Sequence, residues 1–213
     1  MKALCLTILS AFFVFAVFAQ GGRYETAMKS NIAQLDSAMI NNNMAALANN
    51  FERIAEAEKS QWLPYYYAAY CTVMHSFLDE DKSKSDAIAD KAASLIGKAE
   101  SIAGKESSET CVIKSMIASA HLMVDPETRW QQYGQASSEN ILKAKQLDPS
   151  NPRPVYLEGQ AKFYTPESFG GGKAVAKPLF VKAIQMFDTF KPESTLHPAW
   201  GKAATLYFLA QCD

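Results

Sequence analysis

Residues 137–152 read SSENILKAKQLDPSNP, and this stretch decides the fold class. Its small residues Ser137 and Ala144 flank the bulky Ile141 at offsets of four and three, which places all three on one face of a helix. A partner helix can approach closely over the small residues, while the isoleucine fills the space beside them. The closing phrase, LDPSNP, is typical of a boundary between two helices. The stretch therefore predicts the second helix of a packed helical hairpin.

Two features recur along the chain and indicate a repeat. The small, bulky, small stripe occurs again in two further units, as Ala92, Ile96 and Ala99 and as Ala176, Phe180 and Ala183. A proline followed two residues later by an aromatic marks three predicted helix starts: Pro64 with Tyr66, Pro154 with Tyr156, and Pro198 with Trp200. Proline is tolerated there because amides in the first turn of a helix lack partners anyway. A period of about 45 residues predicts a solenoid of stacked units.

The whole chain has the periodicity of helices. Apolar residues recur at spacings of three and four, and no stretch alternates with the period of two that strands require. Clusters of Asn, Ser, Gly and Pro divide the chain into nine predicted helices. They pair into hairpins over residues 23–58, 61–103, 107–147 and 152–190, followed by a lone helix over 198–212. The predicted fold is an all-α superhelix of about four hairpins with a C-terminal capping helix.

Over residues 24–212 the chain resembles the tetratricopeptide repeat family, in particular its divergent exported bacterial members. The second-helix motif of that family is matched by Ser137, Ile141, Ala144 and Pro149, with Ser137 as the small residue. Its first-helix motif is matched by the following four residues: Trp200, Ala203, Ala204 and Tyr207. Units of about 45 residues exceed the roughly 34 of that family. Helices or connectors longer than usual are therefore expected.

The resemblance implies a concave groove lined by the first helix of each hairpin. In the register of the family, the residues that face this groove are Tyr67, Cys71, Met74, Tyr164 and Phe208. They would form the surface that binds a ligand or partner. The alternative is that these side chains pack between the oversized units.

The N-terminus predicts export. Lys2 precedes an apolar run from Leu4 to Phe18, and small residues stand before a cleavage point after Ala19. The expected signal peptide is therefore residues 1–19 and the repeat domain residues 20–213, with no membrane span after processing. The mature chain would hold an odd number of cysteines, Cys71, Cys111 and Cys212, for which free thiols are expected and a disulfide stays open. A net charge of −1 predicts no nucleic-acid partner.

A glycine-rich connector, Phe169, Gly170, Gly171, Gly172 and Lys173, precedes one second helix. Consecutive amides before a helix can cradle a phosphate. The phosphate-loop pattern fails here, however, since it needs a glycine where Glu167 stands and a Ser or Thr where Ala174 stands. We expect the glycines to supply positive φ angles so that a wide turn can close over the hairpin.

Two histidines occupy equivalent positions in neighbouring units, and each is followed four residues later by an acid. The pairs are His75 with Asp79 and His121 with Asp125. Adjacent first helices would bring them to about 10 Å. Four such side chains could bind a metal, which leaves a metal-dependent enzyme as a remote alternative. The simpler interpretation is that the histidines complete the ends of their helices, so no metal site is predicted.

No catalytic arrangement emerges, because no serine stands in a nucleophile elbow and an all-helical chain has no strand to mount one. We expect neither an enzyme nor a cofactor. The first interpretation is an exported scaffold that binds a protein or peptide non-covalently. The alternative is a solute-binding accessory protein that holds a small ligand in the groove or under the glycine-rich connector. The identity of the partner, the oligomeric state, and a periplasmic or secreted location stay open.

Overall fold

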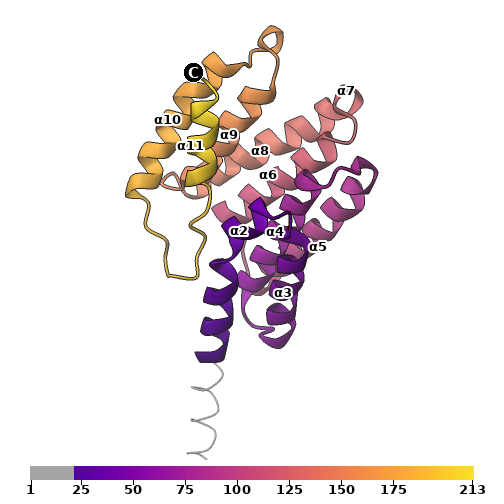
Figure 1. The fold of residues 1–213 in the computed structure, drawn as a ribbon, viewed down its shortest axis with the longest axis vertical. Coiled ribbons are helices and arrows are strands. Elements are labelled where there is room, and N and C mark those ends of the chain that lie inside the picture. The colour runs from indigo at the N-terminus through magenta and orange to yellow at the C-terminus, as the bar shows by residue number, and fades with distance from the viewer. Residues whose placement is uncertain (1–21) are drawn as a thin grey trace, which may run out of the picture.

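The computed structural model describes residues 22–213, and these residues form helices joined by turns and loops (Figure 1). The signal peptide expected at residues 1–19 lies outside this range. No β-strand occurs in the part of the chain that the structure describes, so the all-α prediction is confirmed. None of the helices within residues 22–213 is long and apolar enough to cross a membrane.

The helices follow one another as hairpins, from the first at the bottom of Figure 1 to the last at its upper left. Residues 22–32 are helical, and the α-helices that follow are α2 (Leu35–Ile40), α3 (Met44–Ala57), α4 (Trp62–Leu78), α5 (Ser85–Ala103), α6 (Ser108–Leu122), α7 (Pro126–Arg129), α8 (Gln135–Leu147), α9 (Pro152–Tyr164), α10 (Lys173–Thr189) and α11 (Lys202–Ala210). The short elements are the 3₁₀ turns η1 (Lys82–Lys84) and η3 (Glu167–Phe169) and the π turn η2 (Trp130–Gly134), which joins α7 to α8. The four predicted hairpins are confirmed.

The small, bulky, small stripe forms the core of the second helices, as predicted. All nine of its residues are buried: Ala92, Ile96, Ala99, Ser137, Ile141, Ala144, Ala176, Phe180 and Ala183. The absence of a branched side chain at the alanine positions lets each second helix lie close against the first helix of its hairpin. The stripe thus sets the packing of α5, α8 and α10. Cys71 and Cys111 are buried free thiols, and Cys212 is partly buried and also free.

The last helix begins later than predicted. We expected it to start at Pro198, but α11 starts at Lys202, after Gly201 turns the chain with a φ of 114°. Pro198 is buried in an extended segment, residues 190–201, which we call the strap. The prediction was wrong because Trp200 packs against another helix instead of opening its own. Its ring stacks on Tyr70 of α4 with centroids 4.5 Å apart.

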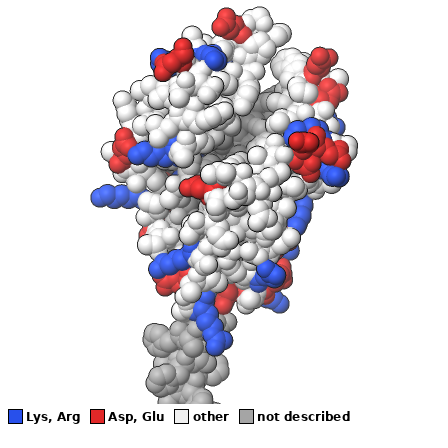
Figure 2. Space-filling model, in the orientation of Figure 1, with Lys and Arg blue, Asp and Glu red and all other residues white. Residues whose placement is uncertain are grey.

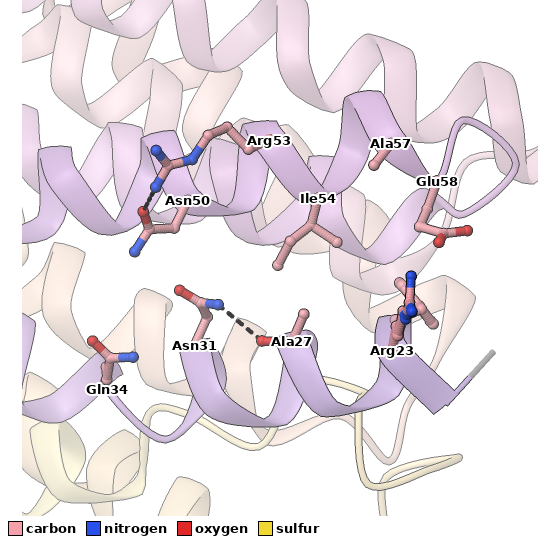
Figure 3. A pocket seen from close by; sticks show the side chains of 10 residues that line it. Arg23, Ala27, Asn31, Gln34, Asn50, Arg53, Ile54, Ala57 and Glu58 are labelled. Atoms are coloured by element: carbon pink, nitrogen blue, oxygen red, sulfur yellow. Dashed lines mark hydrogen bonds between the residues drawn. The ribbon is translucent and has the colours of Figure 1, made fainter. Parts of the chain in front are cut away.

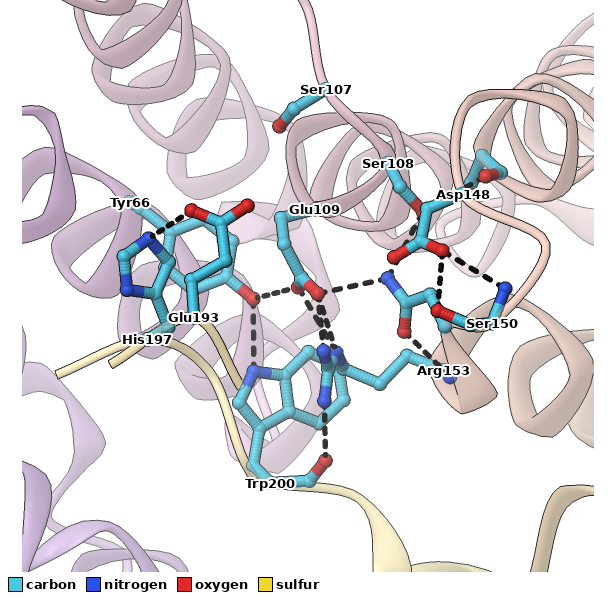
Figure 4. A network of polar contacts seen from close by, with 12 residues as sticks. Tyr66, Ser107, Ser108, Glu109, Asp148, Ser150, Arg153, Glu193, His197 and Trp200 are labelled. Carbon is cyan, nitrogen blue, oxygen red and sulfur yellow. Dashed lines mark hydrogen bonds and ion pairs between the residues drawn. The ribbon is translucent and has the colours of Figure 1, made fainter. Parts of the chain in front are cut away.

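A buried polar network fastens the strap to the middle of the molecule (Figure 4). Its centre is Glu109 at the start of α6, which accepts hydrogen bonds from Arg153 Nε at 3.0 Å, Asn151 Nδ2 at 2.8 Å and the Tyr66 hydroxyl at 3.0 Å. Trp200 Nε1 donates to the Tyr66 hydroxyl at 2.9 Å. The Arg153 side chain is fully buried. One ion pair therefore connects α4, α6, α9 and the strap.

A second ion cluster joins the third hairpin to the second, because Lys114 of α6 pairs with Glu100 of α5 at 2.7 Å. Glu106, in the loop before α6, pairs with Lys114 of α6 at 2.8 Å and with Lys143 of α8. The two ammonium groups lower the pKa of the Glu106 carboxyl from 4.5 to about 2, first through the hydrogen bond from Lys114 and then through that from Lys143. The cluster thus stabilises the charged form of this acid in the folded state.

The Glu106 cluster predicts a pH-dependent stability. Because the pKa is lower in the folded than in the unfolded chain, the stabilisation is complete above pH 4.5 and is lost as the pH falls toward 2. Urea unfolding of the wild type and of Glu106→Gln should show a more stable wild type at pH 6 and a shrinking difference at pH 4 and pH 3. A difference that stays constant over this range would contradict the assignment.

Candidate functional site

Aromatic rings gather where α9, α10 and α11 meet. Phe208 of α11 lies at the centre, stacked on Phe180 of α10 with centroids 5.6 Å apart and in edge contact with Phe163 and Tyr164 of α9 at 5.3 and 5.9 Å. Phe180 and Phe208 are buried, whereas the Tyr164 ring is 69% exposed. Tyr207, the neighbour of Phe208, is 62% exposed. We call the exposed rings of Tyr164 and Tyr207, with Phe163 and Phe208 beneath them, the aromatic face.

The aromatic face is formed by the fourth hairpin and α11, which are the last helices within residues 22–213. Figure 2 shows a hollow between the lobe formed by α9–α11 and the side formed by α6–α8, and the side chains seen in it are uncharged. An uncharged hollow can desolvate one side of a flat apolar ligand.

The electrostatics of the aromatic face are set by the neutral phenol of Tyr164 and by peripheral lysines. Partial burial, and then the proximity of Tyr207, raise the pKa of Tyr164 above its ordinary value, so the phenol stays protonated at neutral pH. Lys173 Nζ lies 5.9 Å from the centroid of the Phe163 ring. Lys162 Nζ donates to the Gly170 carbonyl at 3.3 Å. The site thus combines apolar rings with cations at its margin.

The glycine-rich connector adjoins this site and is shaped by its own hydrogen bonds. Gly171 N donates to the Pro166 carbonyl at 3.2 Å and Gly172 N to the Lys162 carbonyl at 2.9 Å, so these amides are not free to bind a phosphate. Gly170 and Gly172 have φ angles of 77° and 97°, as expected for the turn. At Gly171 an added Cβ would lie 2.2 Å from a backbone oxygen. The connector is a closely packed turn, and its exposed residues are Phe169, Gly170 and Lys173.

Three of the five residues predicted to face the groove lie in the core instead. Tyr67 and Cys71 are fully buried and Phe208 is 7% exposed. The reason is visible at Tyr67, whose ring stacks on Phe51 of α3 at 5.0 Å and whose hydroxyl donates to the Leu196 carbonyl of the strap at 3.0 Å. The remaining two predicted residues differ from each other: Met74 is partly buried, and Tyr164 is exposed. Of the five, Tyr164 alone has a largely exposed ring.

The two histidine pairs do not form as predicted. His75 and Asp79 lie 3.8 Å apart, but His121 pairs with Asp86 of α5 at 2.7 Å and stacks on Tyr133. Asp125 instead caps α7, because its carboxylate accepts from Thr128 N and Oγ1. No group of three or more His, Cys, Asp or Glu side chains in residues 22–213 is placed to hold a metal ion. The two pairs therefore do not come together as the remote metal alternative required.

Sequence reasoning missed a pocket in the first hairpin. It has a volume of about 920 Å³ and lies between residues 23–34 and α3 (Figure 3). The residues that line it are Arg23, Tyr24, Ala27, Asn31, Gln34, Asn50, Arg53, Ile54, Ala57 and Glu58. The signal in the sequence was the small and polar residues at helical spacing, Ala27, Asn31 and Gln34 on one helix and Asn50 and Ala57 on the other, which leave space between the two helices.

Comparison with known proteins gives one informative similarity. No family model matches the chain, and no significant match exists among curated proteins. The tetratricopeptide assignment is therefore not confirmed beyond a loosely similar helical architecture. Among solved structures, the chain is similar to the HusA haemophore from Porphyromonas gingivalis, with 37% sequence identity and a TM-score of 0.78. The similarity covers 89% of this chain and 92% of that one.

Proposed function

Since this chain belongs to the family of the HusA haemophore, we propose that it is an exported protein that binds haem and carries it without chemical change. A haemophore is a carrier of haem, so the proposal assigns a binding function and no reaction. The observation that carries it is the similarity in sequence and fold over nearly the full length of both proteins. The expected signal peptide at residues 1–19 agrees with export.

The small-ligand alternative is thus favoured over the peptide partner that was the first interpretation. A haem ring is flat and largely apolar, and its carboxylates are charged at neutral pH. Aromatic rings stack favourably on such a surface, at about 0.5 to 1.5 kcal/mol per pair beyond the burial of area. The rings of Tyr164 and Tyr207 are exposed. We propose that the porphyrin lies against this aromatic face.

The residues around the aromatic face fit the other parts of haem. The ammonium groups of Lys162 and Lys173 stand at its margin, where they would pair with the carboxylates. Tyr164 would contact the ring as a neutral phenol, because its pKa is raised and not lowered. None of the three histidines of the chain lies on α9, α10 or α11, since His75 is in α4, His121 in α6 and His197 in the strap. These observations support a mode in which ring contacts provide most of the affinity.

A haem titration followed in the Soret band tests the proposal. The wild type should show saturable binding, and Tyr164→Ala should weaken it about tenfold, the equivalent of about 1.4 kcal/mol of lost ring contact. Tyr164→Phe should keep wild-type affinity, because it retains the ring and removes only the hydroxyl. The wavelength of the bound Soret band should be the same for wild type and Tyr164→Phe.

The results of this titration test the proposed function and the proposed binding site separately. A wild type that shows no saturable binding contradicts the proposed function. Binding that Tyr164→Ala leaves unchanged contradicts the aromatic face as its site. If Tyr164→Phe loses as much affinity as Tyr164→Ala and shifts the Soret band, the phenol is an iron ligand and the stacking mode is wrong.

A further inference from the structure

The pocket of the first hairpin exists because α3 directs its apolar side chains elsewhere. Leu47, Phe51 and Ala55 are buried in the core. The other side of the helix presents Asn50, Arg53, Ile54 and Ala57 toward residues 23–34. No bulky stripe closes this hairpin as it does the others. The space between its helices is therefore open, and it lies in a different hairpin from the aromatic face.

The polar groups of this pocket are mainly hydrogen-bond donors. Arg53 donates to the Asn50 side-chain oxygen, and no carboxylate within residues 22–213 forms an ion pair with it. Asn31 Nδ2 donates to the Ala27 carbonyl at 2.8 Å, which leaves a second N–H on the amide. Gln34 Nε2 likewise donates to the Ser30 carbonyl at 2.9 Å. Arg53 thus keeps free N–H groups at an end of the pocket that is rich in amides (Figure 3).

The opposite end holds a buried hydroxyl without a partner. The Tyr24 hydroxyl forms no hydrogen bond among the described residues. Burial, and then the charge of Glu58, raise the pKa of Tyr24 to about 12, so this phenol is a donor at neutral pH. A buried donor without an acceptor is costly, at about 1 to 3 kcal/mol. Arg23 lies near Glu58 at this end (Figure 3).

We propose that this pocket is a second ligand site, which binds a small organic acid with its anionic head at Arg53 and its apolar body against Ala27, Ile54 and Ala57. Figure 3 shows Ile54 pointing into the space between the polar ends. Two arginines outnumber the single Glu58 in the lining, so the charge favours an anion. A volume of about 920 Å³ is in the range of small-molecule sites, which is about 300 to 1,000 Å³.

The test uses anilinonaphthalene sulfonate, a fluorescent organic acid with an apolar body. The probe is titrated into the purified Tyr164→Ala variant, in which the exposed ring of the aromatic face has been removed. Binding should be saturable, and adding Arg53→Gln should weaken it about tenfold, since the charge-assisted contact is lost. Ala57→Phe, which fills the pocket and keeps both arginines, should abolish it. Decanoate should displace the probe, and decanol at the same concentration should not.

The matched control is Lys29→Gln. This lysine lies on the helix of residues 22–32, which forms one side of the pocket. Its side chain is half exposed and pairs with Glu25 at the surface, so its loss should leave the affinity for the probe unchanged. The proposal is overturned if binding is not saturable, or if neither Arg53→Gln nor Ala57→Phe weakens it. It is also overturned if haem displaces the probe from the Tyr164→Ala protein, because the pocket would then be part of the haem site. Circular dichroism of each variant checks that it is folded.

Discussion

Replacing Arg153 with methionine will lower the free energy of unfolding by about 3 to 5 kcal/mol, the cost of leaving a buried charge without its partner. The side chain of Arg153 is fully buried and that of Glu109 is 14% exposed, so water cannot replace the lost hydrogen bonds. Arg153 also lies over the Phe190 ring at 4.8 Å, a contact that methionine keeps only in part. Urea unfolding at neutral pH measures the change.

The double variant Arg153→Met with Glu109→Leu provides the control. It removes the uncompensated carboxylate and should recover part of the lost stability. Recovery will be incomplete, because the Tyr66 hydroxyl and the Asn151 amide lose their acceptor. Lys145→Met, which breaks the more exposed pair with Glu158, should cost less than about 1 kcal/mol. A double variant that is less stable than Arg153→Met alone would contradict this role for the pair.

Phe180→Ala should cost a similar amount, about 3 to 5 kcal/mol, because it leaves a cavity at the most buried ring of the aromatic cluster. Its ring supports Phe208, and Phe208 in turn contacts Tyr164. The same change should therefore weaken haem binding at a temperature where the variant is still folded. Thermal unfolding and the haem titration measure the two effects.

The adjacent Val181 offers the control for Phe180. It lies on the same helix but is 39% exposed, so Val181→Ala should cost less than about 1 kcal/mol and leave the haem affinity unchanged. Equal losses for the two variants would mean that α10 is sensitive to any truncation and that the cluster has no special role.

The second helices could be predicted from the sequence because their packing is local. The stripe of Ala92, Ile96 and Ala99 faces the preceding helix of the same hairpin, and helical periodicity alone identifies that face. The hairpin boundaries followed for the same reason, since Gly104 ends α5 with a positive φ of 70° and Asn151 caps α9. These signals lie within a few residues of the structure that they specify.

The groove residues could not be predicted because distant segments cover them. Tyr67 is shielded from solvent by the strap. The residue of the strap that it contacts, Leu196, lies 129 residues further along the chain. The partner of His121 is Asp86, 35 residues away, although Asp125 is nearer in sequence. The pocket beside Arg53 depends on how far apart two helices lie, which periodicity does not measure. Tyr164 stays exposed, although Phe208 of α11 contacts the edge of its ring.

The strap has a consequence for how this protein can evolve. A repeat protein whose two ends do not contact each other can gain units by duplication or lose them by deletion, because each unit contacts only its neighbours. Here Trp200 and Tyr66 are bonded across 134 residues, so the last segment closes onto the second hairpin. An inserted or deleted hairpin between them would separate the two side chains. We therefore expect relatives of this chain to vary in loops and surfaces rather than in the number of hairpins.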